Sequence, residues 1–169
     1  MLTMYKATRK KLSANQGGFT LIELLVVIGI LAILLAITLI ALNPTQHFQG
    51  ARNAQRSSDV TAILDAVYQY EAANTGNLPS SVSALTASTV YDIRNTATVG
   101  NKMDPCADLA PTYLADLPLD PDSSFGTKTG ATACAATYAT GYTIVKNATN
   151  RLTVAAPHAE NSATISVTR

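Results

Sequence analysis

The chain has 169 residues, the length of a single domain, and 47% of them are hydrophobic. Its 12 basic and 11 acidic residues give a net charge of +1, and removing the four basic residues of the first 18 positions leaves −3. This balance gives no support to a role in nucleic-acid binding, because recognition of phosphates requires a basic patch.

The first predicted element is an apolar helix. Between Leu24 and Leu42 the one polar residue is Thr38. As a helix these nineteen residues extend roughly 28 Å, about the thickness of the hydrocarbon core of a bilayer. Four basic residues precede this segment, and no acidic residue comes before Glu23. The positive-inside rule therefore predicts a cytoplasmic N-terminus and an outward-facing remainder.

Two ordinary interpretations of this N-terminal region compete. A secretory signal has a shorter apolar core and a cleavage site with small residues after that core, whereas Gly17 and Gly18 precede the core. A plain membrane anchor fits the length but does not explain Glu23, since a carboxylate at a helix centre costs about 2.5–3.5 kcal/mol. The cost is smaller near the end of a helix, so a carboxylate at the membrane interface remains an alternative.

The stretch "GGFTLIE", followed by an apolar helix, resembles the class III signal of type IV pilins and type II secretion pseudopilins. The resemblance implies that a prepilin peptidase cuts between Gly18 and Phe19, which removes residues 1–18 as a leader. It also implies that the new amino group of Phe19 is methylated and that residues 19–43 form a transmembrane and assembly helix.

The same resemblance makes Glu23 the charge partner of the Phe19 amine. Each charge alone would be costly in an apolar environment, whereas a pair largely neutralises itself. If the two partners lie on adjacent subunits, the pair forms in only one axial register. We therefore expect Glu23 to be unsatisfied in the monomer and satisfied in a polymer.

A second helical stretch is expected over residues 44–76. Pro44 removes one backbone donor, and we expect it to kink the helix rather than end it. Helical periodicity is carried by the apolar residues Val60, Ile63, Leu64 and Val67. Arg56 and Asp59 are expected on the other faces, where they could pair with each other. Gly76 is suited to a left-handed cap at the end of this amphipathic helix.

Residues 77–169 are predicted to form a globular head in an α+β fold. Ser80 or Ser81 is expected to cap a short helix, and residues 86–112 are expected to form a long loop. Three strands are predicted, in "YATGYTIVKN", "RLTVAAP" and "ATISVTR". They would form a small antiparallel sheet of about three strands packed on the long helix, which the resemblance identifies as the type IV pilin fold.

The two cysteines, Cys106 and Cys134, both lie in the predicted outward-facing head, where oxidation is permitted. A disulfide between them would stabilise the fold by roughly 3–4 kcal/mol in the chain-entropy model. A pair of free thiols is the alternative.

The segment "ADLPLDPDSSFG" contains the candidate calcium ligands Asp116, Asp120, Asp122 and Ser124. Calcium takes six to eight oxygen ligands, which such a loop can supply. The segment also resembles the calcium-binding loop of major pseudopilins. Aspartate and proline are equally ordinary turn residues, so a turn without metal is the alternative. Calcium is the one cofactor that the sequence suggests.

No catalytic constellation is evident in the sequence. His47 and His158 are far apart and are expected at the surface, and Glu160 is expected to form at most a surface pair with Arg151. The resemblance implies a structural subunit rather than an enzyme. A membrane-anchored extracytoplasmic protein with a single span, including an enzyme of that kind, is the remote alternative.

The resemblance further implies a subunit that forms a homo-oligomeric helical filament, with the major pseudopilin of a type II secretion system as the alternative. The expected partners are the prepilin peptidase, an inner-membrane assembly platform, minor pilins and, for the monomer, the membrane itself. The subunit would lie in the inner membrane before assembly and in an extracellular filament afterwards.

Overall fold

The computed structural model describes residues 17–96, 100–130, 134 and 137–169. The chain divides into two compact units, Met1–Asn43 and Pro44–Arg169, each of which is described by itself. The predicted leader lies outside the described residues up to residue 16.

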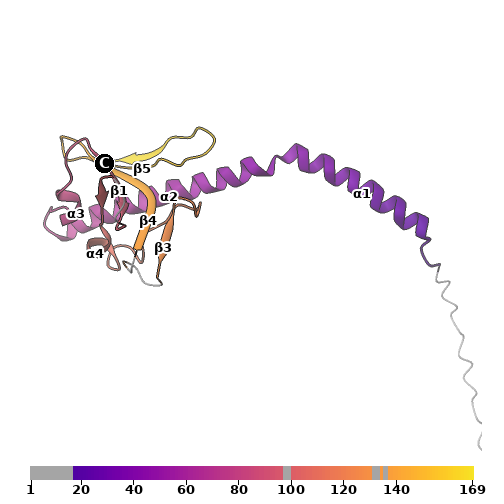
Figure 1. The fold of residues 1–169 in the computed structure, drawn as a ribbon, viewed down its shortest axis with the longest axis horizontal. Coiled ribbons are helices and arrows are strands. Elements are labelled where there is room, and N and C mark those ends of the chain that lie inside the picture. Colours follow the sequence, from indigo (N-terminus) through magenta and orange to yellow (C-terminus); the bar gives the residue numbers. More distant parts are fainter. Residues whose placement is uncertain (1–16, 97–99, 131–133, 135–136) are drawn as a thin grey trace, which may run out of the picture. The chain divides into compact units, whose positions relative to one another are not determined.

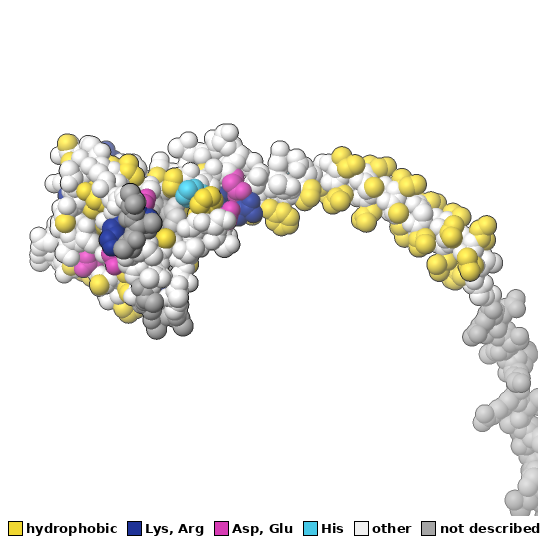
Figure 2. All heavy atoms as spheres, viewed as in Figure 1, with side chains coloured by type: hydrophobic (Ala, Val, Ile, Leu, Met, Phe, Trp, Pro, Cys, Tyr) yellow, Lys and Arg dark blue, Asp and Glu magenta, His cyan; other side chains and the backbone are white. Residues whose placement is uncertain are grey.

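Within residues 17–43, the described part of the first unit, the chain forms the helix α1 (Leu21–Leu42) (Figure 1). Its large apolar side chains are exposed, and Figure 2 shows them gathered along the helix. By length and composition α1 can cross a membrane. The helix ends at Leu42, and its C-cap Asn43 has a left-handed backbone with φ 38°. Asparagine is one of the few residues that adopt this conformation readily.

The second unit begins with α2 (Pro44–Ala73). A proline is favourable at the first helical position, because its missing N–H would have no partner there. The prediction that Pro44 would kink one helix rather than end it was wrong, because α1 ends before the left-handed Asn43 and Pro44 begins a separate helix. At the other end Gly76 has φ +84° and donates its N–H to the Glu71 carbonyl at 2.9 Å. The predicted left-handed cap is thereby confirmed.

The head contains a mixed sheet of six strands in the order β2-β1-β4-β5-β6, with β3 paired to β4. The strands are β1 (Val90–Arg94), β2 (Lys102–Met103), β3 (Thr127–Thr129), β4 (Thr137–Lys146), β5 (Leu152–Ala156) and β6 (Ile165–Thr168). All neighbours are antiparallel except β1 and β2, which are parallel. The α+β class and the three predicted C-terminal strands are therefore confirmed, within a larger sheet than expected.

The prediction of a loop over residues 86–112 was wrong. This segment contains β1, β2 and the short helix α4 (Cys106–Leu109). The short helix expected near Ser80 is present as α3 (Ser80–Ser83), but its N-cap position is Pro79, which provides no side-chain cap. These strands were missed because their alternation is short and polar residues interrupt it.

The main core lies between α2 and one face of the sheet. Val60, Ile63, Leu64 and Val67 of α2 are buried, as are Tyr142 and Ile144 of β4 and Leu152 and Val154 of β5. Because side chains alternate along a strand, Gly141 and Thr143 of β4 belong to the opposite face. The sheet therefore has an inner face that packs on α2 and an outer face.

A smaller core surrounds Cys106, which forms a disulfide with Cys134. The Cα atoms of the two cysteines are 5.3 Å apart. Leu117 and Tyr138 are buried in the same cluster. The disulfide therefore covalently ties α4 to the segment that leads into β4.

Candidate functional site

Two groups of residues are candidate sites within the part of the chain that the structure describes, and only the first was predicted from the sequence. The first is the segment that leads into α1. Gly18 and Phe19 are exposed and precede the helix, and Thr20 is its N-cap. The Thr20 hydroxyl accepts from the Glu23 backbone N–H at 3.2 Å, and the Glu23 carboxylate accepts from the Thr20 N–H at 3.4 Å. These reciprocal bonds form a capping box, which satisfies two donors of the first turn.

The capping box corrects the expectation that Glu23 is unsatisfied in the monomer. Its carboxylate contacts the backbone N–H and the hydroxyl of Thr20, both neutral donors. The side chain is exposed, so its carboxylate remains accessible to a further partner. Its role in assembly stays a prediction, and the helix cap is a second role that the sequence analysis missed. The pattern Thr-x-x-Glu before an apolar run was the available signal.

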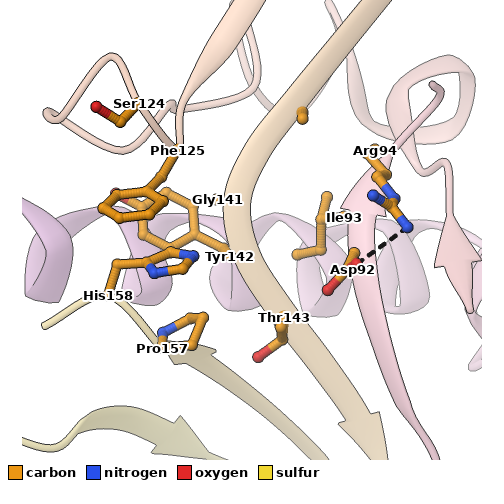
Figure 3. Close-up of a pocket in the computed structure, with 11 residues that line it drawn as sticks. Asp92, Ile93, Arg94, Ser124, Phe125, Gly141, Tyr142, Thr143, Pro157 and His158 are labelled. Atoms are coloured by element: carbon orange, nitrogen blue, oxygen red, sulfur yellow. Dashed lines mark ion pairs between the residues drawn. The ribbon is translucent and has the colours of Figure 1, made fainter. Parts of the chain in front are cut away.

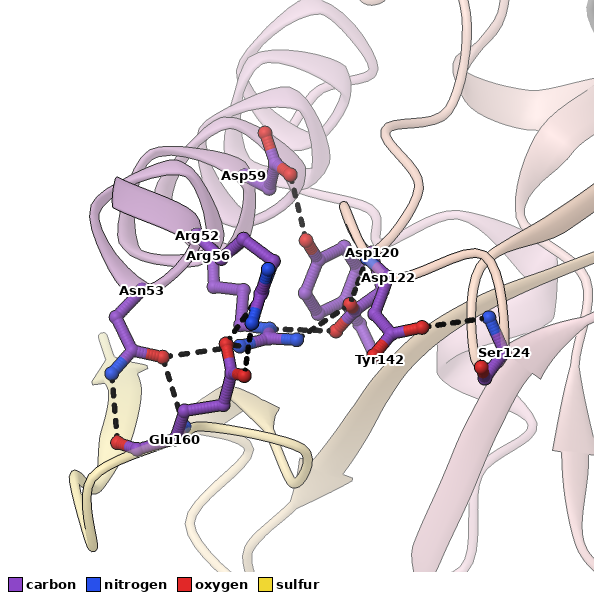
Figure 4. A network of polar contacts seen from close by, with 9 residues as sticks. All are labelled: Arg52, Asn53, Arg56, Asp59, Asp120, Asp122, Ser124, Tyr142 and Glu160. Carbon is purple, nitrogen blue, oxygen red and sulfur yellow. Dashed lines mark hydrogen bonds and ion pairs between the residues drawn. The ribbon is translucent and has the colours of Figure 1, made fainter. Parts of the chain in front are cut away.

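The second group is a polar cluster of Arg52, Asn53, Arg56, Asp120 and Glu160 (Figure 4). The Arg56 side chain is fully buried, and its Nε and Nη2 each donate to one Asp120 oxygen at 2.8 Å. Its Nη1 also donates to Glu160 at 3.0 Å. The hydrogen bonds to Asp120 raise the pKa of Arg56, against the effect of burial. Such bidentate, charge-assisted pairs are both strong and geometrically specific.

Glu160 is held to α2 through both its side chain and its backbone. Arg52 donates to its carboxylate at 2.5 and 2.7 Å. The Asn53 side chain accepts from the Glu160 N–H at 3.0 Å and donates to the Glu160 carbonyl at 2.8 Å. The predicted pair of Glu160 with Arg151 was therefore wrong. The polar cluster joins α2 to the turn before β3 and to the turn after β5.

The predicted pair between Arg56 and Asp59 was also wrong. Asp59 is buried and accepts from the Tyr142 hydroxyl at 2.6 Å and from Gln55 at 2.7 Å. A signal was present in the sequence, because Arg56 lies four residues before Val60, on the same stripe of the helix. A charged residue on this apolar stripe indicates a buried partner, which for Arg56 is Asp120.

The predicted calcium ligands are each engaged by the protein. Asp120 binds Arg56, and Asp116 forms an ion pair with Lys128. The Asp122 carboxylate accepts from the Ser124 N–H at 2.9 Å, which lowers the pKa of Asp122. Within residues 17–96, 100–130, 134 and 137–169, no three His, Cys, Asp or Glu side chains are grouped so that they could hold a metal. This arrangement does not fit a shared calcium site, and calcium binding stays a prediction from the sequence.

Calcium binding can be tested by thermal unfolding of the head in millimolar calcium and in chelator. Because Arg56 occupies Asp120 and the other predicted ligands are engaged elsewhere, we expect equal midpoints in calcium and in chelator, for the wild type and for Asp120→Ala alike. A calcium site would instead stabilise the wild type by about 2.7 kcal/mol when the free calcium concentration is 100 times its dissociation constant. A higher wild-type midpoint that Asp120→Ala abolishes would support the calcium hypothesis.

The stability of the head is expected to fall in acid through Glu160. Hydrogen bonds from Arg52, and further ones from Arg56, lower the pKa of Glu160 from 4.5 to about 2, although burial acts in the opposite direction. A carboxylate with a depressed pKa stabilises the fold above its unfolded pKa, and this contribution is lost as the pH falls through the folded pKa. The loss should therefore lie between pH 4.5 and about 2.

The measurement is the urea midpoint of the wild type and of Glu160→Gln, from neutral pH down through this range. The glutamine variant cannot titrate at this position, so we expect a large difference near neutral pH that narrows in acid. A difference that is constant with pH would contradict a contribution from the charge of Glu160.

The comparison with known families finds one match, between residues 13–39 and the model of the prokaryotic N-terminal methylation motif. No curated protein and no solved structure matches the chain. The match covers Gly18, Phe19 and Glu23 together with most of α1. It points to a structural subunit, and with the apolar α1 it indicates a membrane anchor. Residues 13–39 therefore carry the prepilin-type signal of type IV pilins and pseudopilins.

Proposed function

We propose that this chain is the precursor of a structural subunit of a type IV pilus-like filament. A prepilin peptidase cleaves it between Gly18 and Phe19, the Phe19 amine is methylated, and the subunit polymerises through α1. The observation that carries this proposal is the methylation motif at the start of a 22-residue helix whose apolar side chains are exposed. So large an apolar surface requires a membrane or other protein to cover it.

In this proposal Glu23 has two successive partners. Before assembly it caps α1 through Thr20. During assembly its carboxylate pairs with the methylated Phe19 amine of a neighbouring subunit, since two charges entering an apolar environment together neutralise each other. Before assembly the monomer lies in the inner membrane with its N-terminus in the cytoplasm. An assembly platform and minor pilins then direct its transfer into an extracellular filament.

The major pseudopilin of a type II secretion system is the alternative function, because the same signal occurs in both groups. The two alternatives share cleavage, methylation and polymerisation, and they differ in the machinery around the subunit. Genes for a secretin and secretion components next to this gene would favour the pseudopilin. A gene for a retraction ATPase would favour the pilus.

The proposed processing is tested at the residue before the cut. Gly18→Leu should leave an uncleaved precursor in the membrane, because the peptidase requires a small residue there. Gly17→Leu, one position further from the bond, is the matched control and should still be cleaved. Intact-mass spectrometry of the purified chains is the measurement. A wild-type mature chain that begins elsewhere than at Phe19, or that lacks the added methyl group, would contradict the proposal.

A further inference from the structure

The outer face of the sheet carries a groove of about 200 Å³ (Figure 3). One wall is an aromatic stack of Phe125 and His158, whose ring centroids are 3.6 Å apart at an interplanar angle of 5°. The opposite wall is the ion pair of Asp92 and Arg94, with a distance of 3.2 Å between carboxylate and guanidinium. Gly141 of β4 lies between the two walls.

The aromatic wall depends on a glycine in β4. Gly141 has φ +81°, and a Cβ added there would lie 2.8 Å from the Cβ of Asp120 and 3.3 Å from the carbonyl carbon of Phe125. A larger residue at this position would therefore push the turn that carries Phe125 away from the strand. The close approach of this turn to β4 is what sets one side of the groove.

The groove is built on two turns that the polar cluster fixes from the inner side. The turn before Phe125 is held by the ion pair between Asp120 and Arg56. The turn that carries His158 is held two residues later, where Glu160 binds Arg52 and Arg56. Because both turns are fixed without a ligand, binding in the groove would cost little ordering entropy.

The polar wall offers a carboxylate acceptor and a hydroxyl group, and the wall as a whole carries no net charge. The Asp92 side chain is 47% exposed, so its carboxylate remains accessible although it is paired with Arg94. Thr143 of β4 lies directly across from Asp92 in the β1–β4 register and lines the groove with it. One carboxylate and one guanidinium cancel, so the groove attracts neither an anion nor a cation.

We propose that this groove binds one neutral sugar ring, the terminal pyranose of a glycan. The C–H groups of a pyranose carry a slight positive polarisation and pack on the negative face of an aromatic ring. Its hydroxyls can donate to the Asp92 carboxylate in charge-assisted bonds and exchange bonds with the Thr143 hydroxyl. The volume is below the roughly 300–1,000 Å³ of sites for drug-sized ligands, which limits the occupant to about one ring.

A nucleobase would also stack on an aromatic wall, but its phosphates require basic groups. Among the described residues that line the groove, Arg94 is the one lysine or arginine, and it is paired with Asp92. The side chains from residue 19 onward carry a net charge of −3, after the four leader charges are subtracted from +1. The balance of charge therefore favours the sugar over a nucleotide.

The test is saturation-transfer NMR of the full chain in detergent micelles. The probes are methyl glycosides of glucose, galactose, mannose and N-acetylglucosamine, with uridine monophosphate and sialic acid as charged comparisons. We expect at least one neutral glycoside to bind at millimolar concentration, with the strongest transfer to the C–H protons of one face of the ring. The readout does not require cleavage or polymerisation, so it is independent of the proposed filament function.

Phe125→Ala should weaken this binding by roughly tenfold, since an aromatic contact contributes about 0.5–1.5 kcal/mol beyond its buried area. Asp92→Asn keeps the size of the side chain but removes the charged acceptor, so it should also weaken binding. Phe48→Ala removes a phenyl ring that is 66% exposed on α2 and does not line the groove, so it should bind like the wild type. Circular dichroism confirms that each variant is folded.

Three results would overturn the proposal. The first is that none of the neutral glycosides binds. The second is that a folded Phe125→Ala and a folded Asp92→Asn both bind as the wild type does. The third is that only uridine monophosphate or sialic acid binds, which would make the groove an anion site.

Discussion

Arg56→Met is expected to destabilise the head by about 3–5 kcal/mol, the effect of breaking a buried ion pair by removing one partner. The guanidinium has no exposed surface and binds Asp120 through two hydrogen bonds of 2.8 Å. Without it, the buried Asp120 carboxylate loses its counter-charge and Glu160 loses one of its two arginines. Urea unfolding of residues 44–169 with the disulfide intact measures the change.

Two further variants make this result specific to the buried charge. Arg169→Met removes an exposed arginine paired with Asp65, and it should cost no more than about 1 kcal/mol. The double variant Arg56→Met with Asp120→Leu removes both buried charges and should regain much of the lost stability, because a well-packed apolar pair can replace a buried ion pair. If Arg56→Met unfolds at the same urea concentration as Arg169→Met, the polar cluster does not stabilise the head.

Glu23→Val is expected to leave the chain in the membrane and to reduce filament formation by more than about a hundredfold. Loss of one partner from a buried charge pair costs about 3–5 kcal/mol, and each 1.4 kcal/mol is a factor of ten. Valine also removes a carboxylate from an apolar segment, so insertion should be slightly favoured. Membrane fractionation tests whether the variant stays in the membrane, and the yield of sheared filaments tests assembly. The expected loss of filaments rests on the proposed role of Glu23 in assembly.

Thr20→Ala separates the charge of Glu23 from its role as a helix cap. It removes the hydroxyl that accepts from the Glu23 N–H but keeps the carboxylate. A cap contributes about 0.5–2 kcal/mol, so α1 should fray slightly while filaments still form. Thr38→Val is a matched control on the same helix, because it replaces a hydroxyl that donates only to the Leu35 carbonyl. Equal filament loss in Thr20→Ala and Glu23→Val would show that the cap, not the charge pair, is what assembly requires.

The sequence predicted best the parts of the fold that follow from local patterns. The apolar run of α1, the left-handed Gly76 and the alternating strands β4, β5 and β6 each involve neighbours within one element. By contrast, β1 and β2 are short and pair with each other or with a strand more than 40 residues away, as in the pairing of Val90 with Val145. Such pairings depend on tertiary context, which a local pattern does not contain.

The prepilin-type signal of residues 13–39 was equally accessible to sequence reasoning, because its residues are contiguous. The polar cluster was not, because Arg56 meets Asp120 and Glu160 from 64 and 104 residues away. For the same reason the groove could not be foreseen, since Phe125 and His158 are joined only by the fold. Aspartates in a proline-rich turn suggested a metal, and the structure places a guanidinium against one of them.

The long separation of these partners also sets the order in which the head can fold. The inner face that covers α2 comes from β4 and β5, and the ion-pair partners of Arg56 include Glu160. Because α2 precedes β4 and β5 in the chain, it is synthesised before them, and its apolar stripe is covered only after both strands have been made. Contacts of high sequence separation form slowly, because the entropy of loop closure is lost before the contact is gained. A nascent head that has not yet produced β5 exposes α2 to proteases and to aggregation. The two turns that build the groove become ordered only when α2 is covered.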